Sequence, residues 1–205
     1  MSAILATKLG MTQMFLDDGT VARVTVLQAG PCPVTAIRTP DRDGYDAVQL
    51  AFGETSRKAL TKPRLGHLAK VDAPPMRRLA EFRGEAGELQ LGDSVTVESF
   101  QVGGRVKVSG TAKGKGFQGT IKRHNFTSGP KSHGSHNVRA PGSIGASATP
   151  SRVFRGMRGP GQMGNRRATQ KGLEIVAVDG KRGVLMVRGS VPGPRGAIVE
   201  VRSDA

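Results

Sequence analysis

Several features that identify common protein classes are missing from this sequence. It has one cysteine, Cys32, in 205 residues, so no internal disulfide can form and the class of disulfide-stapled secreted domains is excluded. Cys32 stands between Pro31 and Pro33, with no neighbouring His or cation to lower its pKa. We expect a small, half-buried hydrophobic side chain there and no reactive thiol.

Long hydrophobic runs are also absent. No stretch approaches the ~18 consecutive apolar residues that a membrane-spanning helix needs. Residues 1–8 carry no charged region ahead of an apolar run, which a secretory signal peptide would show. The sequence therefore predicts a cytoplasmic protein with no membrane partner. With no Trp, one Tyr and seven Phe, its core must be built mostly from Val, Leu, Ile and Ala.

The most informative absence is that of acidic residues from one long window. From Ser99 through Leu173 there is no Asp or Glu, whereas Lys and Arg together number 14. Outside the window the chain carries 17 basic and 16 acidic residues, so its net charge of +15 divides into +14 inside and +1 outside. The chain thus combines a nearly neutral body with a polycation.

In the body, short apolar runs alternate with turn residues, as in antiparallel β-proteins. The clearest signal is Asp-Asp-Gly-Thr at 17–20, because Asp-Gly between alternating apolar runs favours a hairpin. A helical pattern is visible only over 61–71. The pattern predicts a mainly β fold, either a small antiparallel barrel or a sandwich. The expected strands are 11–16, 21–27, 34–39, 45–52, 77–82, 94–97, 105–108, 173–178, 183–187 and 197–201.

The polycation lies between two groups of these strands. We therefore expect a body made of residues 1–108 and 168–205, into which residues 109–167 are inserted as a long, mostly irregular basic extension. Only 117–126 has a helical period, with Phe117, Ile121 and Phe126 on one face. A loop of this length is either functional or disordered. Its few apolar residues cannot offset its ordering entropy, so its order should come from a partner.

Nucleic acid is the partner that suits this composition. Lys and Arg neutralise phosphates, Gly lets the main chain approach them, and Phe and His can stack on bases. A membrane-binding segment would instead show an amphipathic apolar stripe. The candidate RNA-binding residues are Lys113, Lys115, Phe117, Lys122, Arg123, His124, Lys131, His133, His136, Arg139, Arg152, Arg155, Arg158, Arg166 and Arg167.

The spacing of these cations distinguishes two kinds of nucleic-acid binding. They recur singly or in pairs among Gly and Pro, whereas most basic tails contain contiguous blocks of Lys. Seven are arginines, whose planar fork suits phosphate recognition and stacking. This pattern favours threading into a folded RNA. The alternative is an architectural protein that coats nucleic-acid duplexes without a fixed site.

The sequence carries no complete enzyme signature. Gly114 to Gly119 matches the G-x-G-x-x-G pattern, but no acidic residue follows before Glu174 to bind a nucleotide ribose. His124, His133 and His136 have no nearby Cys, Asp or Glu to complete a metal site or to orient a catalytic imidazole. We expect no catalytic residues, metal, cofactor or small-molecule substrate.

Four motifs resemble those of a known family. The run SGTAKGKGFQGTIKRHNF at 109–126 is similar to the hallmark segment of bacterial large-subunit ribosomal protein three. KLGMT at 8–12, PGSIG at 141–145 and GQMGN at 161–165 agree with the same family, in order along essentially the whole chain.

The resemblance implies a β-barrel of the translation-protein type, bound to the ribosome on the solvent side of the large subunit. It also implies an extension that penetrates large-subunit (23S) rRNA and approaches the peptidyl-transferase centre without doing chemistry. Family members bind early in assembly and neighbour ribosomal proteins fourteen and nineteen. The extension tip implied by the resemblance is Ser143, Ile144, Gly145, Ala146, Ser147, Ala148 and Thr149, ending at about residue 150.

One position departs from the family pattern. Some bacterial members carry a Gln near the tip that is methylated after synthesis, and the matching residue here is Ala148. That modification cannot occur at Ala148. Because the tip is small and weakly polar, we expect its contacts with RNA to be few and made mainly by the main chain.

Overall fold

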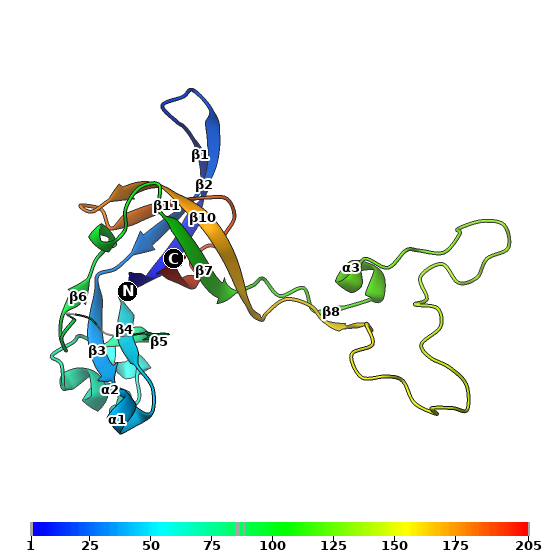
Figure 1. Ribbon diagram of the computed structural model, residues 1–205, viewed down its shortest axis with the longest axis horizontal. Helices are drawn as coiled ribbons and strands as arrows, with labels where there is room; N and C mark the ends of the chain where they lie inside the picture. Colours follow the sequence, from blue (N-terminus) through cyan, green and yellow to red (C-terminus); the bar gives the residue numbers. More distant parts are fainter. Residues whose placement is uncertain (1, 85–86, 88, 205) are drawn as a thin grey trace. The chain divides into compact units, whose positions relative to one another are not determined.

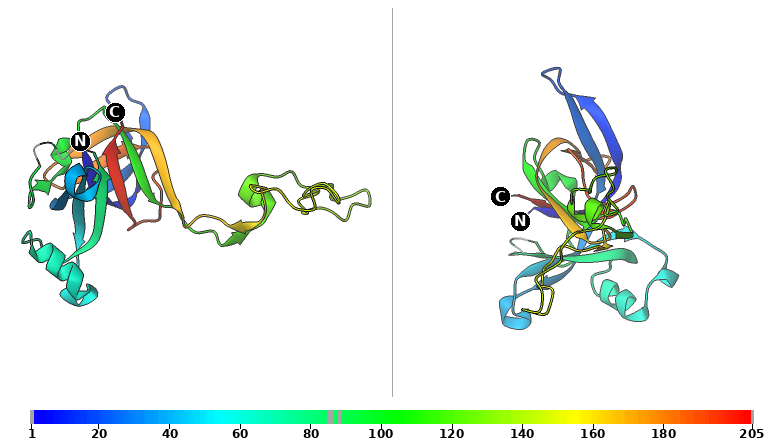
Figure 2. Two further views of the ribbon diagram at one scale, coloured as in Figure 1. Left: turned by 60° about the horizontal axis from the view of Figure 1, so that its bottom comes forward. Right: turned by 90° about the vertical axis from the view of Figure 1, so that its right-hand side faces the viewer.

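A computed structural model of the chain describes residues 2–84, 87 and 89–204. Its centre is a closed antiparallel barrel, with strands in the order β1-β12-β7-β10-β11-β2 (Figures 1 and 2). The prediction of a mainly β fold is confirmed, and the barrel is the correct choice over the sandwich. The barrel strands are β1 (Ala3–Phe15), β2 (Val21–Ala29), β7 (Arg105–Thr111), β10 (Arg167–Asp179), β11 (Val184–Arg188) and β12 (Ile198–Ser203).

The first hairpin forms where Asp-Gly predicted it. The Leu16 N–H donates to the Thr20 carbonyl at 2.9 Å, and Gly19 adopts a φ of +78° that a side chain would disfavour. The first strand nevertheless begins eight residues earlier than the expected Met11. Residues 3–6 are all buried and paired with β12, so they show no apolar–polar alternation from which a strand could be recognised.

A second sheet packs on the same core. Its strand order is β5-β4-β3-β6, and Val34, Leu50 and Phe82 from it join the barrel residues in one continuous cluster. The expected helix over 61–71 is confirmed as α2. The elements of this part are β3 (Cys32–Arg38), α1 (Pro40–Asp43), β4 (Ala47–Glu54), η1 (Arg57–Ala59), α2 (Lys62–Ala69), β5 (Met76–Arg83), β6 (Ser94–Val95) and η2 (Val97–Ser99).

Cys32 is more deeply buried than its flanking prolines suggested. Its side chain is fully enclosed, and the thiol lies 3.5 Å from the carbonyl oxygen of Leu5, to which it donates. The expectation of a half-buried residue was wrong because β3 is an inner strand of the second sheet, and Cys32 packs in the core cluster that this sheet shares with the barrel. Burial raises the pKa of the Cys32 thiol to about 11, which keeps it neutral.

The chain divides into two compact units, a body up to Ala112 and from Arg167 onwards, and the segment Lys113–Arg166, here called the extension. The insertion begins later than the expected residue 109 because β7 continues through Thr111. Ser109 and Gly110 are paired on both sides, with β12 and with β10. A Cβ on Gly110 would approach Val199 Cγ1 to 2.9 Å, so this strand position requires glycine.

Candidate nucleic-acid interface

The two ends of the extension are joined by a short antiparallel ladder. Strand β8 (Phe117–Gln118) pairs with β9 (Gly161–Gln162). Beside them, the Lys115 N–H donates to the Met163 carbonyl and the Met163 N–H donates to the Gly116 carbonyl, both at 2.9 Å. The ladder itself is therefore held by main-chain bonds, which do not depend on charged side chains.

Gly164 allows this ladder to close. It has a φ of +70°, and a Cβ there would overlap the carbonyl oxygen of Lys113. Glycine adopts this combination of left-handed backbone and close approach at low cost, whereas an L residue with a Cβ does not. The glycines of the basic segment thus shape its base as well as leaving the main chain accessible.

A short helix, α3 (Thr120–His124), follows β8. The expected helical face of Phe117, Ile121 and Phe126 does not form, and that prediction was wrong. Gly119 is extended and Asn125 turns left-handed at a φ of +61°, so the helix is confined to five residues. Phe117 instead lies in β8 with 75% of its surface exposed.

Arg123 and His124 hold the two arms of the base together. Arg123 Nη1 donates to the carbonyl oxygen of Gly159 at 2.6 Å, and His124 Nε2 lies 3.2 Å from the same oxygen. Both side chains are only partly exposed. Part of their hydrogen-bonding capacity is consequently used inside the extension, where they position the second arm against α3.

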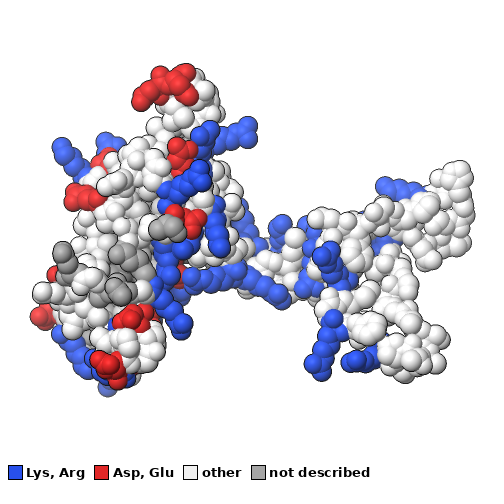
Figure 3. Space-filling view, in the orientation of Figure 1, with Lys and Arg blue, Asp and Glu red and all other residues white. Residues whose placement is uncertain are grey.

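Most of the other predicted RNA-binding residues of the extension are fully available. Because residues 113–166 contain no Asp or Glu, their cations have no carboxylate partner within the extension. On the face drawn in Figure 3, the extension carries Lys and Arg without any acidic side chain. The exposed members are Lys113, Lys115, Phe117, Lys122, Lys131, His133, His136, Arg139, Arg152, Arg155, Arg158 and Arg166.

Arg167 does not belong to the extension. It opens β10, and its two terminal nitrogens donate to the two carboxylate oxygens of Glu200 on β12, with Nη1 3.1 Å from Oε1. The sequence placed it with the other cations because Glu200 is remote along the chain. Its partner comes from the barrel register, which pairs β7 with both β10 and β12.

The outer part of the extension presents flat groups and main chain. Phe154 is 60% exposed, and the guanidinium of Arg152 lies 6.0 Å from its ring centroid. Residues 141–150, which include the tip, are all exposed. At the tip, the Ser143 hydroxyl donates to the Gly145 carbonyl at 3.2 Å. This arrangement offers phosphate contacts and stacking surfaces, but within the extension it has no carboxylate–histidine pair for catalysis.

Two cations that the sequence did not single out lie in the body. Arg77 and Arg78 on β5 line a cavity with Arg167 and Glu200. No local signal marks them, because their relation to β12 arises only from the tertiary arrangement. Separately, no helix in the described ranges is long and apolar enough to cross a membrane.

Comparisons with known proteins agree with the resemblance noted in the sequence. A family model described as "Ribosomal protein L3" matches residues 85–183. The chain is 52% identical over 200 residues to the large ribosomal subunit protein uL3 of Acaryochloris marina, covering 97% of this chain and 94% of that protein. The uL3 of Streptomyces coelicolor is 52% identical over 204 residues, covering 98% and 95% of the two chains. The uL3 of Pelobacter propionicus is 50% identical over 202 residues, covering 98% and 97%.

Proposed function

Because this chain belongs to the ribosomal protein L3 family, whose members are structural, non-enzymatic proteins of the large ribosomal subunit, we propose that its extension binds large-subunit (23S) rRNA. The observation that carries the proposal is the continuous run 113–166, in which exposed cations have no internal carboxylate partner. Such cations are free to replace the counterions of a folded RNA.

The binding contribution of the extension should be largely electrostatic. If about 8–10 of its cations meet phosphates, the logarithm of the association constant should fall with the logarithm of salt concentration at a slope of about −6 to −9. Exposed Phe117 and Phe154 add faces on which unpaired bases can stack. Phosphate contacts then determine most of the affinity, while the shape of the folded RNA determines where on the RNA the protein binds.

The base and the outer part of the extension have different roles in this proposal. The ladder of β8 and β9, together with Arg123 and His124, gives the extension a fixed starting geometry. The outer segment has few internal bonds, so it acquires its final conformation as it enters the RNA. Binding early in assembly follows from this, because rRNA that has already compacted would leave no path for the segment.

The tip, residues 143–149, is proposed to approach the peptidyl-transferase centre and to influence the conformation of the RNA there. Its small, exposed residues support contacts through main-chain groups. The body is proposed to lie on the solvent side of the subunit beside ribosomal proteins fourteen and nineteen. These placements rest on family membership.

The full-length similarity to ribosomal proteins argues against the alternative of a non-ribosomal architectural protein. A competition experiment tests the choice directly, with the intact chain bound to large-subunit rRNA and challenged with duplex DNA of equal length. A fixed-site RNA-binding protein should remain on the rRNA with a salt slope in the stated range. Equal displacement by the duplex, or a slope near −2, would contradict the proposal.

A further inference from the structure

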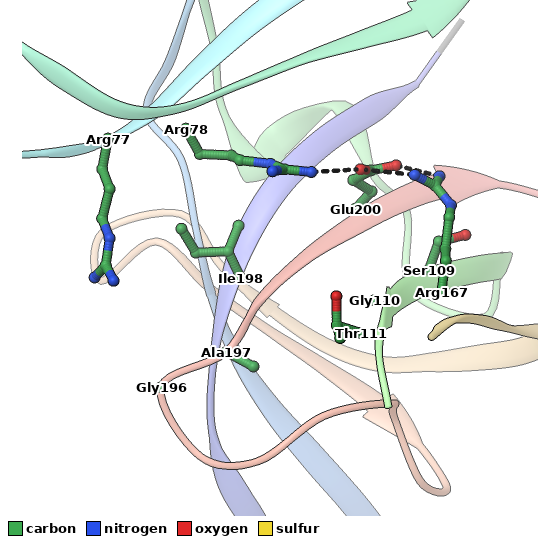
Figure 4. Close-up of a pocket in the computed structure, with 10 residues that line it drawn as sticks. All are labelled: Arg77, Arg78, Ser109, Gly110, Thr111, Arg167, Gly196, Ala197, Ile198 and Glu200. Atoms are coloured by element: carbon green, nitrogen blue, oxygen red, sulfur yellow. Dashed lines mark hydrogen bonds and ion pairs between the residues drawn. The ribbon is translucent and has the colours of Figure 1, made fainter. Parts of the chain in front are cut away.

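The body contains an arginine-lined cavity of about 440 Å³ that is separate from the extension (Figure 4). One wall carries Arg77 and Arg78 of β5, and the opposite wall carries Arg167 of β10. Glu200 lies between Arg78 and Arg167, and the floor includes Gly110 and Gly196. One carboxylate does not neutralise three guanidinium groups, so these like charges repel one another unless a further anion is present.

Glu200 orients two of the three guanidinium groups. Its Oε1 lies 3.1 Å from Arg167 Nη1 and 3.7 Å from Arg78 Nη2, and its Oε2 accepts a second bond from Arg167. The Glu200 side chain is 11% exposed, whereas those of Arg78 and Arg167 are 53% and 61% exposed. The enclosed carboxylate thus holds the Arg167 guanidinium by two hydrogen bonds and forms an ion pair with Arg78, and both guanidinium groups retain N–H groups that Glu200 does not use.

The charges in the cavity do not balance. Three arginines and one carboxylate line the cavity, and among the described residues the Arg77 guanidinium forms no ion pair. Figure 4 shows Arg77 directed away from the Glu200 pairs. The group therefore carries a surplus of two positive charges. Two consecutive phosphodiesters of one nucleic-acid strand, each carrying one negative charge, would match that surplus.

The floor of the cavity is held in place by a buried lysine. Lys8 Nζ donates to the carbonyls of Val191 at 2.7 Å and Gly193 at 3.1 Å, and the Gly196 N–H donates to the Lys8 carbonyl at 2.8 Å. These bonds fix the loop between β11 and β12, which supplies Gly196 to the cavity. A cavity whose floor is fixed and whose Arg167 is already held by Glu200 requires little rearrangement of these parts to bind an anion.

We propose that this cavity binds backbone phosphates of large-subunit rRNA and so gives the body an RNA site of its own. Arg77 and Arg78 contact the phosphates, Arg167 contributes from the opposite wall, and Glu200 is a positioning residue. This inference rests on the proposed function, since it names the RNA as the source of the phosphates. The cavity differs from the RNA-binding site of the proposed function in that it requires no residue of the extension.

The test compares the intact chain with two double variants of equal charge. R77Q/R78Q removes the cavity cations, and R23Q/R182Q removes two exposed arginines of the body that do not line the cavity. Affinity for large-subunit rRNA is measured across a salt series, with thermal unfolding as the check on folding. We expect R77Q/R78Q to weaken binding on the order of tenfold and to reduce the magnitude of the salt slope by about 1 to 2. The control should change affinity by less than about threefold, as expected for arginines that make no phosphate contact.

The single variant R77Q keeps the experiment decisive if R77Q/R78Q is unstable. Arg77 forms no ion pair among the described residues, so R77Q should fold normally and reduce the magnitude of the salt slope by about 1. Equal losses for R77Q/R78Q and R23Q/R182Q, or an unchanged slope for R77Q, would overturn the cavity as a phosphate site. If the intact chain itself shows a slope near −2 and no preference for rRNA, the proposed function fails instead.

Discussion

Arg167 on β10 donates two hydrogen bonds to Glu200 on β12. The last cation of the extension predicted over residues 109–167 is therefore part of the barrel. On the adjoining strand β7, Thr111 pairs directly with Arg167. These strands could be joined by a two-residue turn, and the chain instead inserts 112–166 between them. The extension can therefore be removed in principle without changing the register of the barrel.

The first prediction concerns the base of the extension. Gly164→Ala should weaken rRNA binding on the order of tenfold, because a Cβ at a φ of +70° would strain the backbone and overlap the Lys113 carbonyl oxygen. The charge is unchanged, so the salt slope should stay the same. Filter binding across a salt series measures both quantities.

Gly114→Ala is the matched control for that variant. A Cβ on Gly114 would lie 3.5 Å from the Cβ of Asn165, which is an ordinary contact. It should bind rRNA within about twofold of the intact chain, because nothing in the ladder has to move. Equal effects of the two substitutions would show that the closed ladder does not contribute to binding.

The second prediction concerns Lys8. Lys8→Met should lower the free energy of unfolding by about 2–4 kcal/mol, because the buried carbonyls of Val191 and Gly193 would lose their donor. Urea denaturation followed by circular dichroism measures this change. Lys58→Met, at an exposed position in η1, should change stability by less than about 0.5 kcal/mol. A comparable loss of stability in both variants would contradict the role of Lys8 in holding the loop between β11 and β12.

The third prediction concerns pH. The pKa of Cys32 is raised from 9.0 to about 11 in the folded chain because burial disfavours the thiolate. The corresponding stability is present below pH 9 and is lost as the pH rises through 11. It amounts to about 2–3 kcal/mol, since one pKa unit corresponds to about 1.4 kcal/mol.

Alkaline unfolding of the intact chain and of Cys32→Ala isolates this contribution. The intact chain should lose stability more steeply than the variant between pH 9 and 11. At pH 8 the native thiol should resist iodoacetamide until the protein is unfolded by urea. Rapid alkylation of the native protein, or parallel pH profiles for the two chains, would contradict the burial of Cys32.

The fourth prediction concerns the tip. Replacing residues 143–149 with two glycines removes no Lys or Arg, so rRNA affinity should change by less than about threefold. Large subunits assembled with this variant should nevertheless show reduced peptidyl transfer with a small aminoacyl acceptor. Ordinary activity in those subunits would contradict the proposed position of the tip.

Features of the fold that depend on neighbouring residues could be predicted from the sequence, whereas features that depend on contacts between distant segments could not. The turn at 17–20 and the helix α2 were predictable because their signals are local. The helix over 117–126 was predicted too long, because the period of its apolar residues outweighed the backbone preferences of Gly119 and Asn125. The early start of β1 and the fork between Arg167 and Glu200 depend on strand register, which no single segment encodes.

The candidate site shows the same limit. The absence of acidic residues from 113–166 was visible in the sequence, and the structure leaves most of the cations there exposed. Arg123 and His124 were chosen for RNA but also bond to Gly159, a contact between residues more than 30 positions apart. Arg77 and Arg78 were missed because the cavity that they line forms only in the tertiary structure, where Arg78 meets Glu200 from 122 positions further along the chain.

The role of the extension is tested most directly by the rRNA affinity of a chain in which residues 112–166 are replaced by Asn-Gly, joining Thr111 to Arg167 in a two-residue turn. Circular dichroism and thermal unfolding would first establish that the barrel is retained. We expect this variant to lose most of the affinity of the intact chain. Its salt slope should change from between about −6 and −9 to about −2, which is the part left to the body. A folded variant that binds large-subunit rRNA as tightly and as salt-dependently as the intact chain would contradict this expectation.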